Sequence, residues 1–91
     1  MRILGDIPHP RYKITILEMS SKITIQIEDG MLSQSYRFRD GAAVTNVASA
    51  IEFCDEIFLH KIDSVFTQMQ GNMIQASERI SNSNEQFQQF I

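Results

Sequence analysis

The strongest constraint on this chain is a strict two-residue alternation within residues 22–28. Isoleucine fills every odd position of that stretch and a polar residue fills every even one. This period is typical of a β-strand with one buried face. The segments on either side alternate in a similar way, from Tyr12 onward and as far as Phe38, and β-branched residues are frequent throughout. Residues 12–38 are therefore predicted to form a three-stranded antiparallel meander.

Turn chemistry predicts the register of the meander. Residues 29–30 are Asp-Gly, a strong hairpin signal, because a type I′ turn needs positive φ at both central residues. A second, weaker turn is predicted at the two serines of residues 20–21. The cross-strand neighbours that these two turns predict are Ile27 and Leu32, Ile23 and Tyr36, Thr24 and Ser35, Ile16 and Ile25, Ile14 and Ile27, and Lys13 and Glu28. Both registers place the isoleucines on one face, and a slip by one residue would break that arrangement.

After the sheet the apolar period becomes helical. Apolar residues recur at three- and four-residue steps through residues 43–70, which predicts a long amphipathic helix packed on one face of the sheet. Two alternatives stay open. Thr45-Asn46 would cap a later start of the helix, and Asp55 would begin a second helix after a break near Phe53-Cys54.

Both ends of the chain are predicted to flank this core. Residues 1–11 would supply an edge strand and then a connector stiffened by two prolines. Gly71 is interpreted as the end of the long helix or as a kink, and helical spacing resumes over residues 72–80. Serine and asparagine then predict a break, which leaves residues 81–91 as a flexible polar tail. The apolar residues of this tail that would dock on a partner are Phe87, Phe90 and Ile91.

Length and composition fit a single α+β domain over residues 1–80. A chain of 91 residues folds alone with a modest core, and its apolar fraction of 43% is ordinary for a globular protein. No apolar run approaches the roughly 20 residues of a membrane span. The start has no signal-peptide pattern, and one cysteine cannot form an intrachain disulfide. We therefore expect a cytoplasmic protein with no membrane partner.

The sequence contains no catalytic motif. Cys54 lies on the apolar stripe, so a buried, inert thiol is expected rather than a nucleophile. Glu56, His60 and Asp63 share one helix face, but a single histidine between two carboxylates is common on solvated helices, so no metal site is predicted. His9 is interpreted as a turn residue whose ring packs on the domain. Without a phosphate-binding loop or a nucleophile elbow, neither an enzyme nor a cofactor is expected.

The net charge of −3 is divided unevenly along the chain. Residues 1–39 carry six Lys/Arg and four Asp/Glu, or +2, and residues 40–91 carry two and seven, or −5. Such a division can orient a partner or a second copy of the chain, although solvated charges with no role would look the same. The basic residues predicted on or beside the outer face of the sheet, and so the candidate binding residues, are Lys13, Lys22, Arg37 and Arg39.

A meander followed by a long helix resembles the element order of the small dimeric single-strand-binding proteins of the PC4/Whirly type. The resemblance implies nucleic-acid binding through a basic groove with aromatic stacking platforms. The predicted outer face has no aromatic residue, because Tyr12, Tyr36 and Phe38 point into the core. The acidic pI of about 5.2 also argues against this function.

The opening of the chain carries a second resemblance. Its residues are Ile3-Leu4-Gly5-Asp6-Ile7-Pro8-His9-Pro10, followed by Tyr12-Lys13-Ile14. They resemble the start of a group of small proteins from Bacteroidota, which implies a bacterial chain but no particular activity.

The sequence thus predicts an α+β fold with an antiparallel sheet of three or four strands. A long amphipathic helix, in one piece or two, would cover one face and leave the outer strands as unpaired edges. Edges of that length are usually protected or used for binding. A non-catalytic protein-interaction module or accessory subunit is therefore expected, a homodimer or part of a larger complex, assembling through a sheet edge or the helix face. Single-stranded nucleic-acid binding is the alternative.

Overall fold

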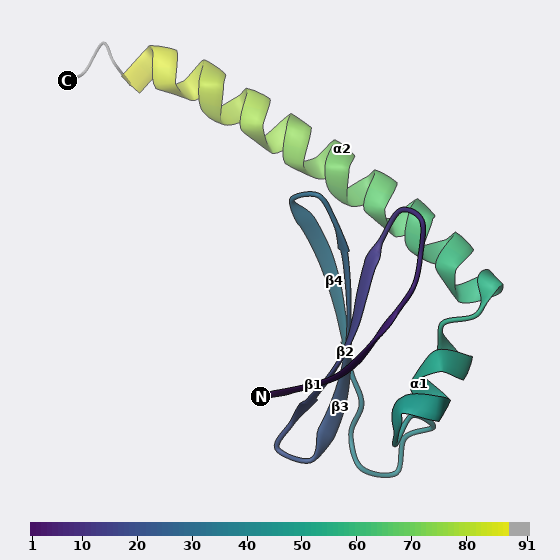
Figure 1. The fold of residues 1–91 in the computed structure, drawn as a ribbon. Coiled ribbons are helices and arrows are strands. Elements are labelled where there is room, and N and C mark those ends of the chain that lie inside the picture. Colours follow the sequence, from purple (N-terminus) through teal and green to yellow (C-terminus); the bar gives the residue numbers. More distant parts are fainter. Residues whose placement is uncertain (88–91) are drawn as a thin grey trace.

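A computed structural model describes the backbone of residues 1–87 and the side chains of residues 1–82. The described residues form an antiparallel sheet in the order β1-β2-β3-β4, followed by two helices (Figure 1). The elements are β1 (Arg2–Ile7), β2 (Lys13–Met19), β3 (Lys22–Asp29), β4 (Leu32–Arg37), α1 (Val47–Phe53) and α2 (Glu56–Phe87). The predicted α+β fold is confirmed, and the first segment does join the meander as a fourth strand.

The β2–β3 hairpin has the predicted register. Met19 pairs with Lys22 across a two-residue turn, which brings Ile16 opposite Ile25 and Lys13 opposite Glu28. The two serines of the turn have φ angles of 53° and 65°, so both lie in the left-handed region that a type I′ turn requires. The turn therefore forms without glycine.

The β3–β4 hairpin differs from the prediction by two residues. Asp29 pairs with Leu32, so the turn consists of Gly30 and Met31, and only the glycine has positive φ, at 62°. A glycine at the first central position fits a type II′ turn. The predicted pairs across this turn are therefore wrong, and the observed pairs include Ile27 with Gln34, Ile25 with Tyr36, Gln26 with Ser35 and Thr24 with Arg37. Because the shift is an even number of residues, each side chain stays on its predicted face.

One face of the sheet carries the hydrophobic core. Isoleucines of β2 and β3 are fully or almost fully buried there under α1 and the first turns of α2. The buried members are Tyr12, Ile14, Ile16, Ile23, Ile25, Ile27, Val44, Ala50, Cys54, Ile62 and Phe66. Burying an isoleucine contributes about 1.5–3 kcal/mol, so this layer is the main source of stability.

An aromatic cluster closes the core where the two helices meet. Phe53 of α1 lies 4.5 Å from Phe58 of α2 between ring centroids, and 4.9 Å from Phe38. The ring of Tyr36 in β4 meets Phe58 edge-on at 5.2 Å. These contacts hold α1, α2 and the last strand together, at about 0.5–1.5 kcal/mol for each aromatic pair.

The helical region is divided at Cys54, as one of the sequence alternatives predicted. Asn46 caps α1: its Oδ1 accepts from Ser49 N at 2.9 Å, and Ser49 Oγ accepts from Asn46 N at 3.1 Å. Asp55 then starts α2, because its carboxylate accepts a hydrogen bond from Phe58 N at 2.8 Å. Two side chains that satisfy free backbone donors therefore set both helix starts.

Helix α2 does not end where the sequence predicted. It passes Gly71 without a break and continues through Ser81 and Asn82 as far as Phe87. Glycine costs a helix about 1 kcal/mol relative to alanine, and serine and asparagine cost less, so none of them forbids the helix. The prediction of a break at residues 81–84 is therefore wrong, and residues 88–91 of the predicted tail lie outside the described part.

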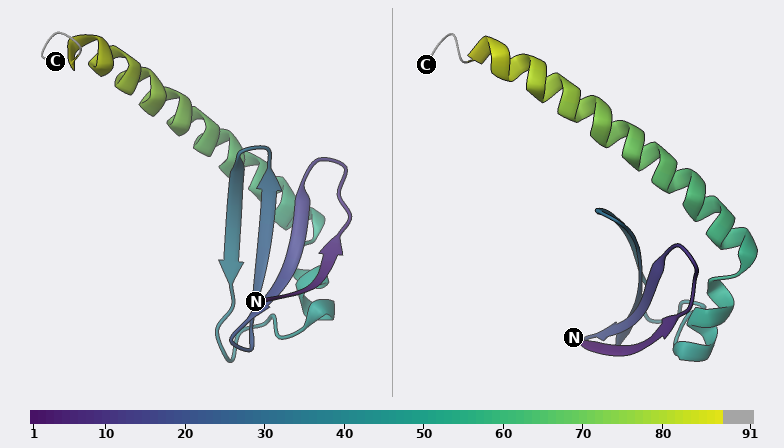
Figure 2. Two further views of the ribbon diagram at one scale, coloured as in Figure 1. Left: turned by 60° about the vertical axis from the view of Figure 1, so that its left-hand side comes forward. Right: turned by 45° about the horizontal axis from the view of Figure 1, so that its top comes forward.

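The second half of α2 leaves the sheet and projects beyond it (Figures 1 and 2). The radius of gyration is 17.7 Å, whereas a compact domain of this length has about 12 Å. Met69 is the last residue of α2 that packs against the core. Residues 70–87, here called the α2 overhang, extend about 27 Å further at 1.5 Å per residue.

Candidate interaction site

The apolar stripe of α2 continues from the core onto the overhang. It consists of residues spaced alternately by four and three positions: Ile62, Phe66, Met69, Met73, Ala76 and Ile80. Under the sheet the stripe is closed, since Ile62 is 1% exposed and Phe66 is 3% exposed. Beyond the sheet it is open, with Met73 at 41% and Ile80 at 60%. The same spacing that buries the first half of α2 therefore leaves an unpartnered apolar face on the second half.

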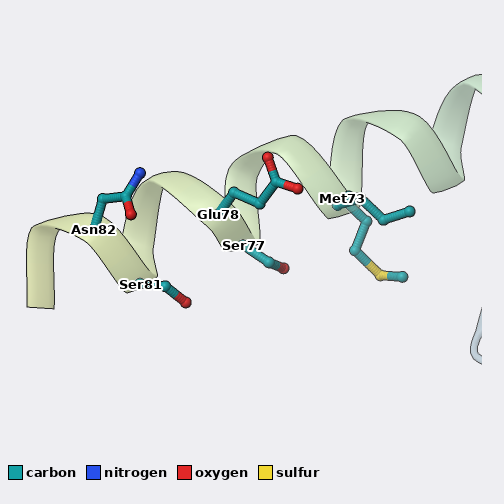
Figure 3. A pocket seen from close by; sticks show the side chains of 6 residues that line it. Met73, Ser77, Glu78, Ser81 and Asn82 are labelled. Carbon is teal, nitrogen blue, oxygen red and sulfur yellow. The ribbon is translucent and has the colours of Figure 1, made fainter.

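A shallow depression runs along the overhang beside this stripe (Figure 3). Its lining residues all belong to α2: Met73, Ile74, Ser77, Glu78, Ser81 and Asn82. Ile74 is 48% exposed and widens the apolar surface. Because one helix alone lines the depression, it is an open surface suited to another protein element rather than an enclosed pocket for a small molecule.

Few interactions within the overhang itself stabilise its helical conformation. Its described side chains include only two charges, Glu78 and Arg79, which cancel, and several weak helix formers such as Ser77 and Ser81. Within residues 1–82 the ion pairs are Arg2–Glu18 at 3.0 Å and Arg11–Asp29 at 3.2 Å, both outside α2. Most helical stability in proteins comes from packing of the apolar face. The apolar stripe of the overhang therefore has no packing partner among the described residues.

The overhang starts beside a hollow between the β3–β4 turn and α2. Its apolar lining includes Met31, Leu32, Phe66 and Met73, and Arg11 and Asp29 contribute polar groups. Met31, at the tip of the turn, is 91% exposed. The apolar surface of the overhang is thus continuous with the end of the sheet.

The structure brings three of the four predicted basic residues together. Lys22, Arg37 and Arg39 line one surface hollow with Met19 and Ser20, where the β2–β3 turn meets the end of β4. None of the three forms an ion pair with any residue of the described chain. The fourth, Lys13, lies at the other end of β2, opposite Glu28.

Two residues on the same outer face are buried, which the sequence did not predict. Leu17 and Thr24 are each 7% exposed, and Thr24 lies opposite both Leu17 and Arg37 in neighbouring strands. Thr24 Oγ1 is buried without a hydrogen-bond partner among the described residues. An unsatisfied hydroxyl of this kind is unusual in a folded protein.

The predicted docking residues of the C-terminal tail cannot be placed as a group. Phe87 is the last described residue of α2, and its side chain is outside the described part. Phe90 and Ile91 lie beyond the described residues altogether. Their role in docking stays a prediction.

His9, Tyr12 and Asp63 form a contact that fastens the β1–β2 connector to α2. His9 Nδ1 accepts hydrogen bonds from Arg11 N at 3.1 Å and from Tyr12 N at 3.0 Å, and its ring stacks on Tyr12 with centroids 4.8 Å apart. The Tyr12 hydroxyl donates to the Asp63 carboxylate. His9 therefore packs on the domain as predicted, and Asp63 has a structural partner. Residues 1–82 contain no cluster of three metal-ligating side chains.

Cys54 is buried between the two helices and is 8% exposed. Burial and, to a smaller extent, the neighbouring Asp55 carboxylate together raise the pKa of its thiol to about 11. The thiol is therefore protonated at neutral pH, a state in which cysteine is a poor nucleophile.

Comparison of the chain with known protein families, with curated proteins and with solved structures finds no match. The two resemblances drawn from the sequence therefore stay predictions. Among the described residues, no helix combines the length and the apolar character needed to cross a bilayer.

Proposed function

We propose that this chain is a cytoplasmic, non-catalytic protein-interaction module that assembles with a second copy through the α2 overhang. The observation that carries the proposal is the apolar stripe of α2, which is buried under the sheet and continues at the same spacing onto an exposed helix. Of the two routes that the sequence left open, this favours the helix face over a sheet edge.

The size of the exposed stripe sets the expected strength of assembly. Burying the exposed parts of Met73 and Ile80 would contribute about 1 kcal/mol for each side chain. A pair of copies buries four such side chains, or about 4 kcal/mol in total, which matches only the lowest estimates of the entropy lost on association. The described part of the interface therefore supports a weak, concentration-dependent dimer rather than a permanent one.

Sedimentation velocity over a concentration series from micromolar to millimolar tests this proposal. We expect the wild-type mass to rise above the 10.4 kDa of one chain. A variant with Met73→Glu and Ile80→Glu should stay monomeric, because assembly would bury two charges in each copy. Ile57→Glu is the matched control, since Ile57 lies on the first turn of α2 and is already 71% exposed. A wild-type protein that stays monomeric throughout, or a double variant that assembles equally well, would contradict the proposal.

Single-stranded nucleic-acid binding is the second candidate function, and one observation favours it. Lys22, Arg37 and Arg39 share a hollow and have no acidic partner among the described residues, so phosphate groups could occupy positions between them. The described outer face offers no aromatic platform for bases, because Tyr12, Tyr36 and Phe38 pack on the core side.

Fluorescence anisotropy with a labelled single-stranded oligonucleotide tests this second candidate. Binding through the hollow should weaken steeply with salt, and Arg37→Ala should reduce the slope of log affinity against log salt by about 1. Lys13→Ala serves as the control, because Lys13 has the same charge type but lies at the other end of the sheet. Absence of binding at low salt, or equal losses in both variants, would rule out recognition by this hollow.

A further inference from the structure

We infer that the two overhangs pack antiparallel, side by side, with a two-fold axis passing beside residue 78. This inference rests on the proposed function and specifies the geometry of that assembly. Residue 69 of one copy would face residue 87 of the other, and residue 73 would face residue 83. Each overhang would then be the partner that the other one lacks.

The sheets exclude the parallel alternative. In each copy the sheet covers the stripe at Ile62 and Phe66, on the same helix face that is open at Met73 and Ile80. Packed helices lie 8–10 Å apart, so a parallel partner helix would run through the space that the sheet occupies. In an antiparallel pair, the partner helix ends near the first copy's sheet instead of passing through it. The partner's own sheet then lies at the opposite end of the pair.

The length of the overhang fits this arrangement. The free stripe begins after Met69, the last residue that packs on the core, and the structure describes α2 as far as Phe87. Full antiparallel overlap centred on residue 78 covers the whole free stripe of both copies. It brings residue 87 of each helix to the hollow under the partner's β3–β4 turn, where the apolar lining includes Met31 and Phe66. Between residues 70 and 87, no part of the stripe is left without a partner and no part is forced against the sheet.

The residues facing each other are complementary in size and charge. Ala76 of one copy faces Ile80 of the other, so a small side chain meets a large one in both symmetry-related layers. Glu78 points away from the stripe, about 160° around the helix at 100° per residue. Arg79 flanks the stripe near the axis, and as an exposed, flexible side chain it can extend into solvent.

The charge of the overhang also argues for a second copy over other occupants. The overhang contains two acids, Glu78 and Glu85, and one base, Arg79, so its net charge is only −1 and it selects neither a strongly acidic nor a strongly basic partner. A helix that binds a membrane surface is typically rich in Lys and Arg on its polar face, and here Arg79 stands alone. A weakly charged helix with a regular apolar stripe is suited to an identical helix.

Disulfide trapping with mixed variants tests the geometry. In a Cys54→Ala background, which has no other cysteine, Met73→Cys and Ser83→Cys are prepared as separate proteins and oxidised alone and mixed. Only the mixture should cross-link, because the antiparallel pair brings residues 73 and 83 together. Identical positions would lie about 15 Å apart along the axis, at ten residues and 1.5 Å per residue. Glu78→Cys is the control, since residue 78 is level with the axis but on the outer side of each helix.

The mass of the unoxidised samples, measured at the same concentration, separates the two levels of the proposal. Assembled protein in which the mixture alone cross-links is the expected result. Assembled protein in which each single variant cross-links with itself would overturn the antiparallel geometry and leave the proposed function standing. Assembled protein with no specific cross-link would also overturn it, by pointing to another surface or register. Monomeric protein throughout would contradict the proposed function itself.

Discussion

Ile16→Ala is expected to lower the free energy of unfolding by about 3 kcal/mol, within the 2–5 kcal/mol typical of such truncations. Ile16 is 0% exposed in an inner strand, between Gly5 of β1 and Ile25 of β3. Removing three carbons there leaves a cavity that strands on both sides prevent from closing. A domain of this size has about 5–15 kcal/mol of stability in total, so one substitution would remove a large part of it.

Urea denaturation followed by circular dichroism measures this effect. Ile57→Ala provides the control, because it removes the same atoms from a side chain that is 71% exposed. We expect the control to change stability by less than about 0.5 kcal/mol. Equal losses in the two variants would mean that the sheet face carrying Ile16 is not the core of the domain.

The two hairpins show how far sequence reasoning reaches for this sheet. In β2–β3 the alternation and the turn agree, and the register was predicted correctly. In β3–β4 the alternation fits two registers equally well, because a shift of two residues returns every side chain to the same face. Only turn chemistry separates them, and Gly30 suits the second position of a type I′ turn as well as the first position of a type II′ turn. The strand order and buried face are therefore predictable, but the pairing across Gly30 is not.

The overhang was not predicted, although the sequence holds a signal that would have indicated it. Strands of six to eight residues span about 20–27 Å, whereas the 32 residues of α2 span about 48 Å. A helix twice as long as the strands it covers must leave the sheet. Gly71 and the serines and asparagines after residue 80 are residues that often end helices, which is why the sequence predicts an end or a break there. Their helix-breaking cost is small compared with the persistence of the apolar spacing.

The candidate binding residues were predicted in part. Lys22 and Arg37 occupy polar positions in the strand alternation, which predicts that they lie on the outer face. The structure brings both together with Arg39. Lys13 could have been excluded, because its predicted pairing with Glu28 already set it at the far end of β2. The burial of Thr24 had no signal in the sequence, since it depends on neighbouring side chains and on the curvature of the sheet.

Cys54 is expected to react with iodoacetamide at pH 8 roughly 100-fold more slowly in the folded protein than in urea. The folded pKa of about 11 lies well above the ordinary value of 9.0, because burial and the Asp55 carboxylate both disfavour the thiolate. The fraction of thiolate falls tenfold for each unit by which the pKa exceeds the pH. Limited access of the reagent to the buried sulfur slows the reaction further. Mass spectrometry of the alkylated protein over time measures both rates. A folded rate equal to the rate in urea would show that Cys54 is exposed and ionised.

The same raised pKa makes stability depend on pH in a defined window. Below pH 9 the thiol is protonated in both states, so it contributes nothing that changes with pH. Between pH 9 and 11 the unfolded chain loses its proton first, which favours unfolding, so stability should fall across this window. Lysine and tyrosine side chains titrate in the same range, and for that reason the comparison is with Cys54→Ala under identical conditions. The difference in stability between wild type and Cys54→Ala should shrink or reverse as pH rises from 9 to 11. A difference that stays constant would mean that the thiol ionises equally easily in the folded protein, which its position between α1 and α2 should prevent.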